Sequence, residues 1–123
     1  MSKTGLGISF SNRINSFKFA FKGLWTMFSE EPNFRVHFLA ALATVLLGIF
    51  YELNVTEWIQ ITIVIGFVLV SEIFNSSIER IADFVSPEHN KIIGITKDLC
   101  AAMVLVAATV AVIVGLLIFL PKF

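Results

Sequence analysis

Residues 99–120 contain no charged side chain, and this apolar run constrains the fold more than any other feature of the chain. A helix of about 20 apolar residues crosses the ~30 Å hydrocarbon core of a bilayer, so the run is long enough to span a membrane. Two further apolar runs, 38–51 and 58–70, precede it. Hydrophobic side chains make up 57% of the 123 residues, and the mean hydropathy is +0.88. These values predict a membrane protein.

We expect one all-α integral membrane domain over residues 1–123, with three spanning helices and an N-terminal amphipathic surface helix. In the surface helix, at about 10–30, apolar residues recur in steps of four and three while the cations lie off that stripe. The same apolar face is equally suited to packing against other helices. Pro32 ends this helix because proline disfavours continuation of a helix. The spanning helices are expected at 34–53, 56–85 and 97–120, with Thr56 as the N-cap of the second.

The charges predict both the partners and the orientation of the chain. The formal net charge is zero, which gives no support to a nucleic-acid partner. No secretory signal is evident, so the whole chain is taken as mature protein. Lysine and arginine are concentrated before the first span and around the second loop, and the first loop has none. The positive-inside rule therefore places the N-terminus and the second loop in the cytoplasm.

A stripe of acidic and amide side chains follows the 58–70 run with no proline or glycine between them, so one helix is expected to carry both. At about 100° per residue, Glu72, Asn75, Glu79 and Asp83 fall within an arc of roughly 80°. Charged residues at the hydrocarbon boundary usually face a bundle interior or an aqueous cavity. The plainer alternative is a helix that simply becomes soluble, with Asp83 as its solvated end.

Several groups suited to phosphate chemistry are expected on the same cytoplasmic face as this stripe. They are Glu31, Lys97 and Asp98. Carboxylates with an adjacent lysine suit Mg²⁺ and a phosphorylated ligand, and a desolvated carboxylate suits a general base. The chain has no P-loop or kinase-type glycine loop. Spacing alone thus predicts a metal or cation site at a membrane surface. An enzyme, a cation-binding or cation-conducting protein without catalysis and a catalytically silent assembly subunit all remain open.

The segment from Glu72 to Glu79, followed by Asp83 and by the Lys97-Asp98 pair, closely resembles the prokaryotic diacylglycerol kinase family, which includes the undecaprenol kinases. The family pattern E-x-x-N-[ST]-x-I-E-x-x-x-D followed by K-D matches in residue type and spacing. Segments 16–23 and 31–37 also resemble the family, so that the resemblance extends over about 13–120.

The resemblance implies a three-span homotrimeric kinase of the bacterial cytoplasmic membrane that phosphorylates a lipid alcohol with MgATP, at sites between subunits on the cytoplasmic face. Glu79 and Glu31 would hold Mg²⁺, Glu72 would be the general base, and Asn75 would position the reacting groups. The residues that would contact the nucleotide are Phe19, Glu88, His89, Asn90, Lys97 and Asp98. Phe19 stands where the family often has tyrosine, so stacking on adenine would remain but a hydroxyl hydrogen bond would not.

The lipid substrate is the least defined part of this prediction. Arg13 is the nearest counterpart of the family's lipid-contacting arginine, and Trp25 and Arg35 are further candidates for lipid contact. Trp25 is also suited to a role as an interfacial anchor. Both diacylglycerol and undecaprenol offer a terminal hydroxyl on an apolar body. Segment 33–37 is more similar to the undecaprenol-using branch.

Overall fold

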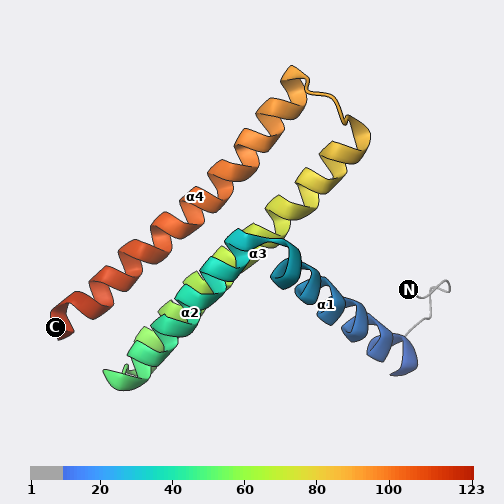
Figure 1. The fold of residues 1–123 in the computed structure, drawn as a ribbon. Helices are drawn as coiled ribbons and strands as arrows, with labels where there is room; N and C mark the ends of the chain where they lie inside the picture. Colours follow the sequence, from blue (N-terminus) through green and yellow to red (C-terminus); the bar gives the residue numbers. More distant parts are fainter. Residues whose placement is uncertain (1–9) are drawn as a thin grey trace. The chain divides into compact units, whose positions relative to one another are not determined.

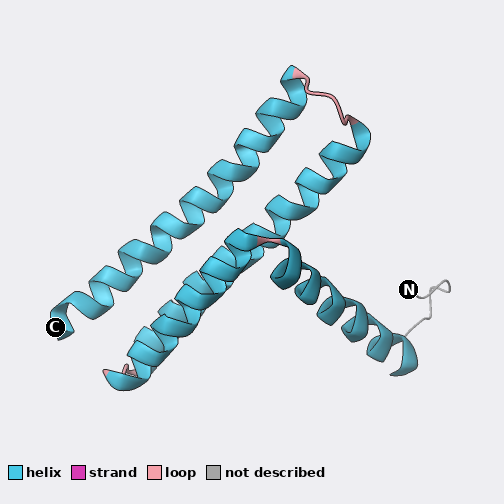
Figure 2. Cartoon of the chain, viewed as in Figure 1, coloured by secondary structure: helices cyan, strands magenta, loops and turns pink. Residues whose placement is uncertain are grey.

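The computed structural model describes residues 10–123, and every regular element in that range is a helix (Figures 1 and 2). The helices are α1 (Phe10–Glu30), α2 (Pro32–Phe50), α3 (Val55–Val85) and α4 (Lys91–Phe119), followed by the short 3₁₀ helix η1 (Leu120–Lys122). Three of them, α2, α3 and α4 extended through η1, are long and apolar enough to cross a membrane. The prediction of an all-α membrane fold with three spans is confirmed.

The break at Pro32 separates two compact units, which are described here one at a time. Helix α1 ends at Glu30, and α2 begins at Pro32 itself. Proline is favourable at the first position of a helix, because the N–H that it lacks would have no partner in the helix there. The first unit ends at Pro32, and the second comprises Asn33–Phe123.

Asn54 is the N-cap of α3. It lies two residues before Thr56, the N-cap that the sequence led us to expect. Asn54 Oδ1 accepts a hydrogen bond from Glu57 N at 2.9 Å, and Glu57 Oε1 accepts one from Asn54 N at 3.1 Å. This reciprocal arrangement is a capping box, which satisfies two backbone donors at once. The prediction of Thr56 as the N-cap is wrong because Asn54 already has the extended backbone of a cap, while Thr56 lies inside the helix.

Helices α3 and α4 form an antiparallel hairpin, and they are the most extensively paired helices of the second unit (Figure 1). A buried cluster at the hairpin's open end contains Leu53, Ile61, Ile118 and Phe119. Lys122 Nζ lies 3.1 Å from Glu57 Oε2, so an ion pair joins the C-terminal residues to the start of α3. These contacts stabilise the end of the bundle that lies opposite the polar stretch of α3.

Helix α4 begins six residues earlier than the predicted 97–120, at Lys91. Asn90 is its N-cap, with Oδ1 accepting from Ile93 N at 2.9 Å. Asparagine is a strong N-cap, and no proline follows it to interrupt the helix. Lys97 and Asp98 consequently lie in the second turn of α4 and not at its start.

Candidate active site

Helix α3 projects the acidic stripe beyond its apolar portion. Its 31 residues correspond to about 46 Å of helix, against a ~30 Å hydrocarbon core. The buried face of α3 continues from Val64 and Val68 to Ser71, Glu72 and Ser76. The face of α3 that packs inside the bundle therefore changes from apolar to polar residues toward the C-terminal part of the helix. This is expected for residues that line an interior site.

Glu72 is buried, with 4% of its surface exposed, and it contacts a histidine on the neighbouring helix. Its Oε1 lies 3.1 Å from Nε2 of His37, which is half-buried on α2. A buried carboxylate is costly unless it is hydrogen-bonded or paired with a charge. The contact with His37 supplies one such interaction and joins α2 to α3 at this level.

Asn75 lies about one helical turn beyond Glu72 on α3, and its side-chain oxygen is a hydrogen-bond acceptor without a donor among residues 10–123. Its Oδ1 is buried and accepts no hydrogen bond within the described part of the chain. A buried acceptor without a partner costs on the order of 1–3 kcal/mol. Such an atom is suited to receive a donor from a ligand.

Glu79 is partly buried two turns beyond Glu72, about 10 Å along the helix axis. That separation keeps the two carboxylates from sharing one ion and allows them different roles. Next to Glu79, Arg80 Nε donates to Ser76 Oγ at 3.2 Å, so the polar end of α3 has its own side-chain contacts.

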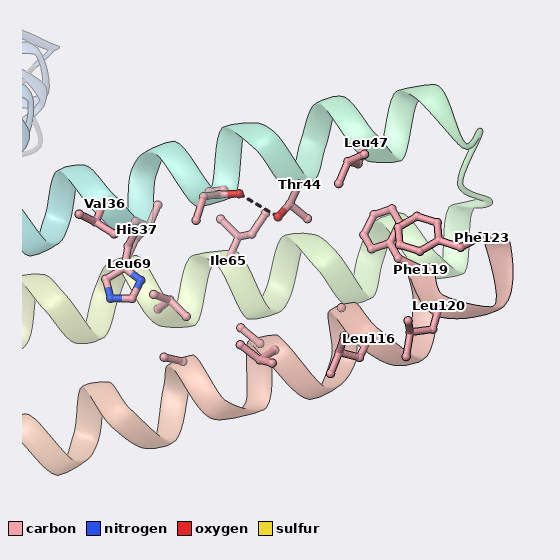
Figure 3. A pocket seen from close by; sticks show the side chains of 17 residues that line it. Val36, His37, Thr44, Leu47, Ile65, Leu69, Leu116, Phe119, Leu120 and Phe123 are labelled. Atoms are coloured by element: carbon pink, nitrogen blue, oxygen red, sulfur yellow. Dashed lines mark hydrogen bonds between the residues drawn. The ribbon is translucent and has the colours of Figure 1, made fainter.

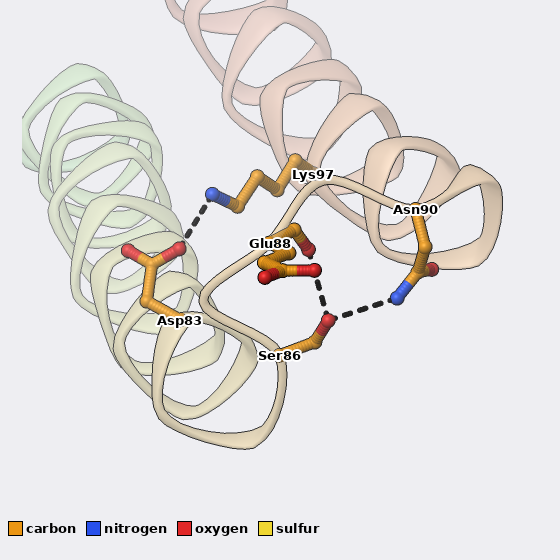
Figure 4. A network of polar contacts seen from close by, with 5 residues as sticks. All are labelled: Asp83, Ser86, Glu88, Asn90 and Lys97. Atoms are coloured by element: carbon orange, nitrogen blue, oxygen red, sulfur yellow. Dashed lines mark hydrogen bonds and ion pairs between the residues drawn. The ribbon is translucent and has the colours of Figure 1, made fainter.

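Lys97 extends from α4 toward α3, where its Nζ donates to Asp83 Oδ1 at 2.6 Å (Figure 4). Glu79 lies about one helical turn before Asp83 on α3. Asp83 is therefore a partner of Lys97 as well as the end of the stripe. The neighbouring Asp98 is exposed and adds a carboxylate next to the lysine.

The turn after α3 has a hydrogen-bond network of its own (Figure 4). Ser86 Oγ donates to the backbone oxygen of Glu88 at 2.9 Å, and Asn90 Nδ2 donates to Ser86 Oγ at 2.9 Å. Asn90 thus uses its amide nitrogen in the turn and its oxygen in the cap of α4. Glu88 and His89 are exposed and accessible to a ligand.

The remaining candidates belong to the first unit or to the start of α2. Arg13, Phe19 and Trp25 are exposed on α1, and Glu31 is the single residue between α1 and α2. Arg35 is half-buried in the first turns of α2. Lys97 meets α3 at Asp83, whereas Glu72 contacts His37 of α2, eleven residues earlier on the same helix. The roles of all the candidate residues, in both units, stay predictions.

A metal ion would need more than protein ligands here. Within residues 10–123, no group of three or more His, Cys, Asp or Glu side chains is placed to hold one. Mg²⁺ normally takes one or two carboxylates and completes its shell with phosphate oxygens and water. The carboxylates present fit Mg²⁺ delivered with a nucleotide.

An apolar pocket of about 540 Å³ lies between α2, α3 and α4 (Figure 3). His37 lies toward one end and Phe119 and Phe123 toward the other. Small side chains, including Ala41, Ala108 and Gly115, widen it between these ends. The pocket is suited to a long apolar molecule.

Sequence reasoning did not identify His37 as a candidate site residue. The available signal was the hairpin register. His37 lies 13 residues before the end of α2 and Glu72 lies 17 residues after the start of α3, so the two levels differ by about one helical turn. Helical periodicity within one segment does not reveal such a pair.

These features define the class of the protein as a small helical membrane protein whose longest spanning helix carries several carboxylates beyond its apolar portion. A family model described as prokaryotic diacylglycerol kinase matches residues 18–119, and the chain belongs to that family. It is therefore a lipid kinase, an enzyme class that takes its phosphate from ATP.

Named relatives agree with this assignment. The chain is 38% identical to an undecaprenol kinase of Bacillus subtilis over 87% of both chains. It is 30% identical to a diacylglycerol kinase of Escherichia coli K12 over 85% of both chains. It is 33% identical to one from Haemophilus influenzae, over 86% of this chain and 92% of the relative.

Proposed function

We propose that the protein transfers the γ-phosphoryl group of MgATP to the terminal hydroxyl of a lipid alcohol. The observation that carries the proposal is the buried Glu72, which lies one turn from the unsatisfied Asn75 oxygen. A carboxylate can take the single proton of a hydroxyl. The neighbouring amide of Asn75 has both a donor and an acceptor and can orient the hydroxyl oxygen. Family membership supports the same reaction class.

In this reaction Glu72 accepts the hydroxyl proton while the lipid oxygen attacks the γ-phosphorus. The bond from that phosphorus to the bridging oxygen breaks, and ADP leaves with the electron pair. Phosphoryl transfer depends mainly on positioning and charge neutralisation. Lys97 would neutralise phosphate charge, Asp98 would contact the nucleotide nearer its sugar, and Asn75 would orient the reacting oxygen.

Glu79 and Glu31 are the proposed Mg²⁺ ligands, and the metal would neutralise charge on the nucleotide phosphates when bound. Phe19 and the exposed turn residues Glu88 and His89 would contact the nucleotide, with Asn90 at the same turn. Arg13, Trp25 and Arg35 would contact the lipid. The support for these roles is the resemblance to the family, from which Phe19 departs because it replaces the common tyrosine.

Of the two lipid classes, we propose undecaprenol ahead of diacylglycerol. The 38% identity to the Bacillus subtilis undecaprenol kinase is higher than the 30% identity to the Escherichia coli diacylglycerol kinase. Both lipids carry one hydroxyl on an apolar body, so the same chemistry serves either.

The proposal includes a homotrimer in the bacterial cytoplasmic membrane, with the N-terminus and the active site facing the cytoplasm. The distribution of lysine and arginine supports this orientation, because the loop between α2 and α3 carries neither. ATP is found on the cytoplasmic side.

The test is a phosphorylation assay on detergent-solubilised protein, with labelled ATP and with undecaprenol and diacylglycerol in parallel. We expect labelled lipid that depends on Mg²⁺, a faster reaction with undecaprenol, and loss of activity in Glu72→Gln. Full activity in that variant would remove the proposed base. Cation flux in liposomes together with no ATP turnover on any lipid would instead favour a cation-conducting protein.

A further inference from the structure

His37 connects the apolar pocket to the buried carboxylate. Its Nε2 lies 3.1 Å from Glu72 Oε1, and the imidazole also forms part of the pocket lining (Figure 3). Glu72 itself is not part of that lining. A molecule in the pocket would therefore contact His37, which is the residue that joins the apolar lining to Glu72 of the acidic stripe.

The contact constrains the carboxylate in a defined direction. A glutamate side chain has several rotamers, and a hydrogen bond to one oxygen restricts them. When the imidazole Nε2–H donates to Oε1, it fixes the plane of the carboxylate and therefore the direction in which Oε2 points. The imidazole is half-buried and the carboxylate almost fully buried, so the bond is shielded from competition by water.

We propose that His37 is a positioning residue for this kinase. It orients the Glu72 carboxylate toward the hydroxyl of a lipid whose apolar body lies in the pocket between α2, α3 and α4. The inference rests on the proposed function, because it takes Glu72 as the general base. His37 acts through Glu72 and exchanges no proton with the substrate.

The first experiment tests the contact without using activity. Protein labelled with ¹⁵N-histidine is compared with the same protein carrying Glu72→Gln, by NMR in detergent micelles. Loss of the carboxylate is expected to shift the His37 ring nitrogens and leave those of His89 in place. Identical His37 signals in the two proteins would overturn the proposal, whether or not the protein is a kinase.

The second experiment tests the role of the contact. His37→Leu keeps bulk but removes the donor, whereas the amide of Gln in His37→Gln reaches about as far as Nε2. In His37→Leu the Glu72 base is less well oriented. We therefore expect kcat to fall about tenfold or more, with the KM for ATP little changed. His37→Gln is expected to recover most of that loss.

The control is Thr109→Val on α4, whose hydroxyl bonds only within its own helix and lies outside the pocket. It is expected to match the wild type. Equal kcat in His37→Leu and the wild type would overturn the proposal, as would equal losses in the Leu and Gln variants. If His37→Leu does not give monodisperse helical protein, His37→Phe takes its place in the same comparison.

Discussion

Lys97 Nζ and Asp83 Oδ1 are 2.6 Å apart, which joins the second turn of α4 to the last turns of α3. Both side chains are substantially exposed, at 40% and 63%. Exposed ion pairs usually contribute about 0–1 kcal/mol to stability, so this contact is a weak structural link. The contact places the lysine at Asp83, one helical turn from Glu79 on α3, where a phosphate would compete with Asp83 for the lysine.

Lys97→Met and Asp83→Asn separate these two roles of the lysine. Removing the cation is expected to raise the KM for ATP about tenfold or more, because a charge-assisted contact to phosphate is lost. Asp83→Asn breaks the same ion pair but keeps the lysine, and it is expected to retain near-normal turnover. Steady-state kinetics with varied ATP measure both. Equal losses in the two variants would mean that the ion pair itself is what activity needs.

Glu79→Gln and Glu72→Gln are expected to respond differently to magnesium. Activity should disappear with EDTA and return when Mg²⁺ is added. Glu79→Gln removes a proposed metal ligand, so its remaining activity should need a higher Mg²⁺ concentration. Glu72→Gln removes the base and should lower kcat by about 10²-fold or more at every Mg²⁺ concentration. Mg²⁺ titrations of both variants provide the measurement, and identical Mg²⁺ dependence in the two would contradict the separate roles.

Gly48→Ala is expected to loosen the packing of α2 against α3. A Cβ at this position would lie 2.7 Å from Trp58 Cη2 and 2.9 Å from Leu53 Cδ1, so the rigid tryptophan ring would have to shift as a whole. Overpacking of this kind costs about 1–3 kcal/mol. Thermal unfolding in detergent, followed by circular dichroism, measures the change. Gly66→Ala is the matched control, because a Cβ there meets no atom within 4 Å. If Gly48→Ala were as stable as this control, the side chains of Trp58 and Leu53 would move aside at no cost, and the prediction would be wrong.

Asn54→Ala tests which residue caps α3. Loss of an N-cap side chain costs about 1 kcal/mol, and here the reciprocal bond from Asn54 N to Glu57 is weakened with it. The exposed Thr56 lies inside the helix, so Thr56→Ala should have little effect. Denaturation midpoints of the two variants decide between them. A larger loss from Thr56→Ala would favour the cap that was first expected.

Local sequence patterns predict much of the fold. The uncharged run 99–120 requires a spanning helix because a bilayer core offers no partner to an exposed backbone group. The step from Glu30 to Pro32 requires a helix boundary because proline cannot continue a helix. The spacing from Glu72 to Glu79 places both carboxylates on one face, since helical geometry is set by the backbone alone. The family pattern lies in these same residues.

Contacts between helices could not be obtained in this way. Asn54 and Thr56 are both good caps by residue type, and the backbone conformation at the turn selects Asn54. His37 has the same local neighbours whether it faces lipid, water or Glu72. Only the packing of α2 against α3 brings its Nε2 to 3.1 Å from the carboxylate. Periodicity describes the faces of one helix, whereas a site between helices depends on register and rotation, which side-chain packing along the whole interface determines.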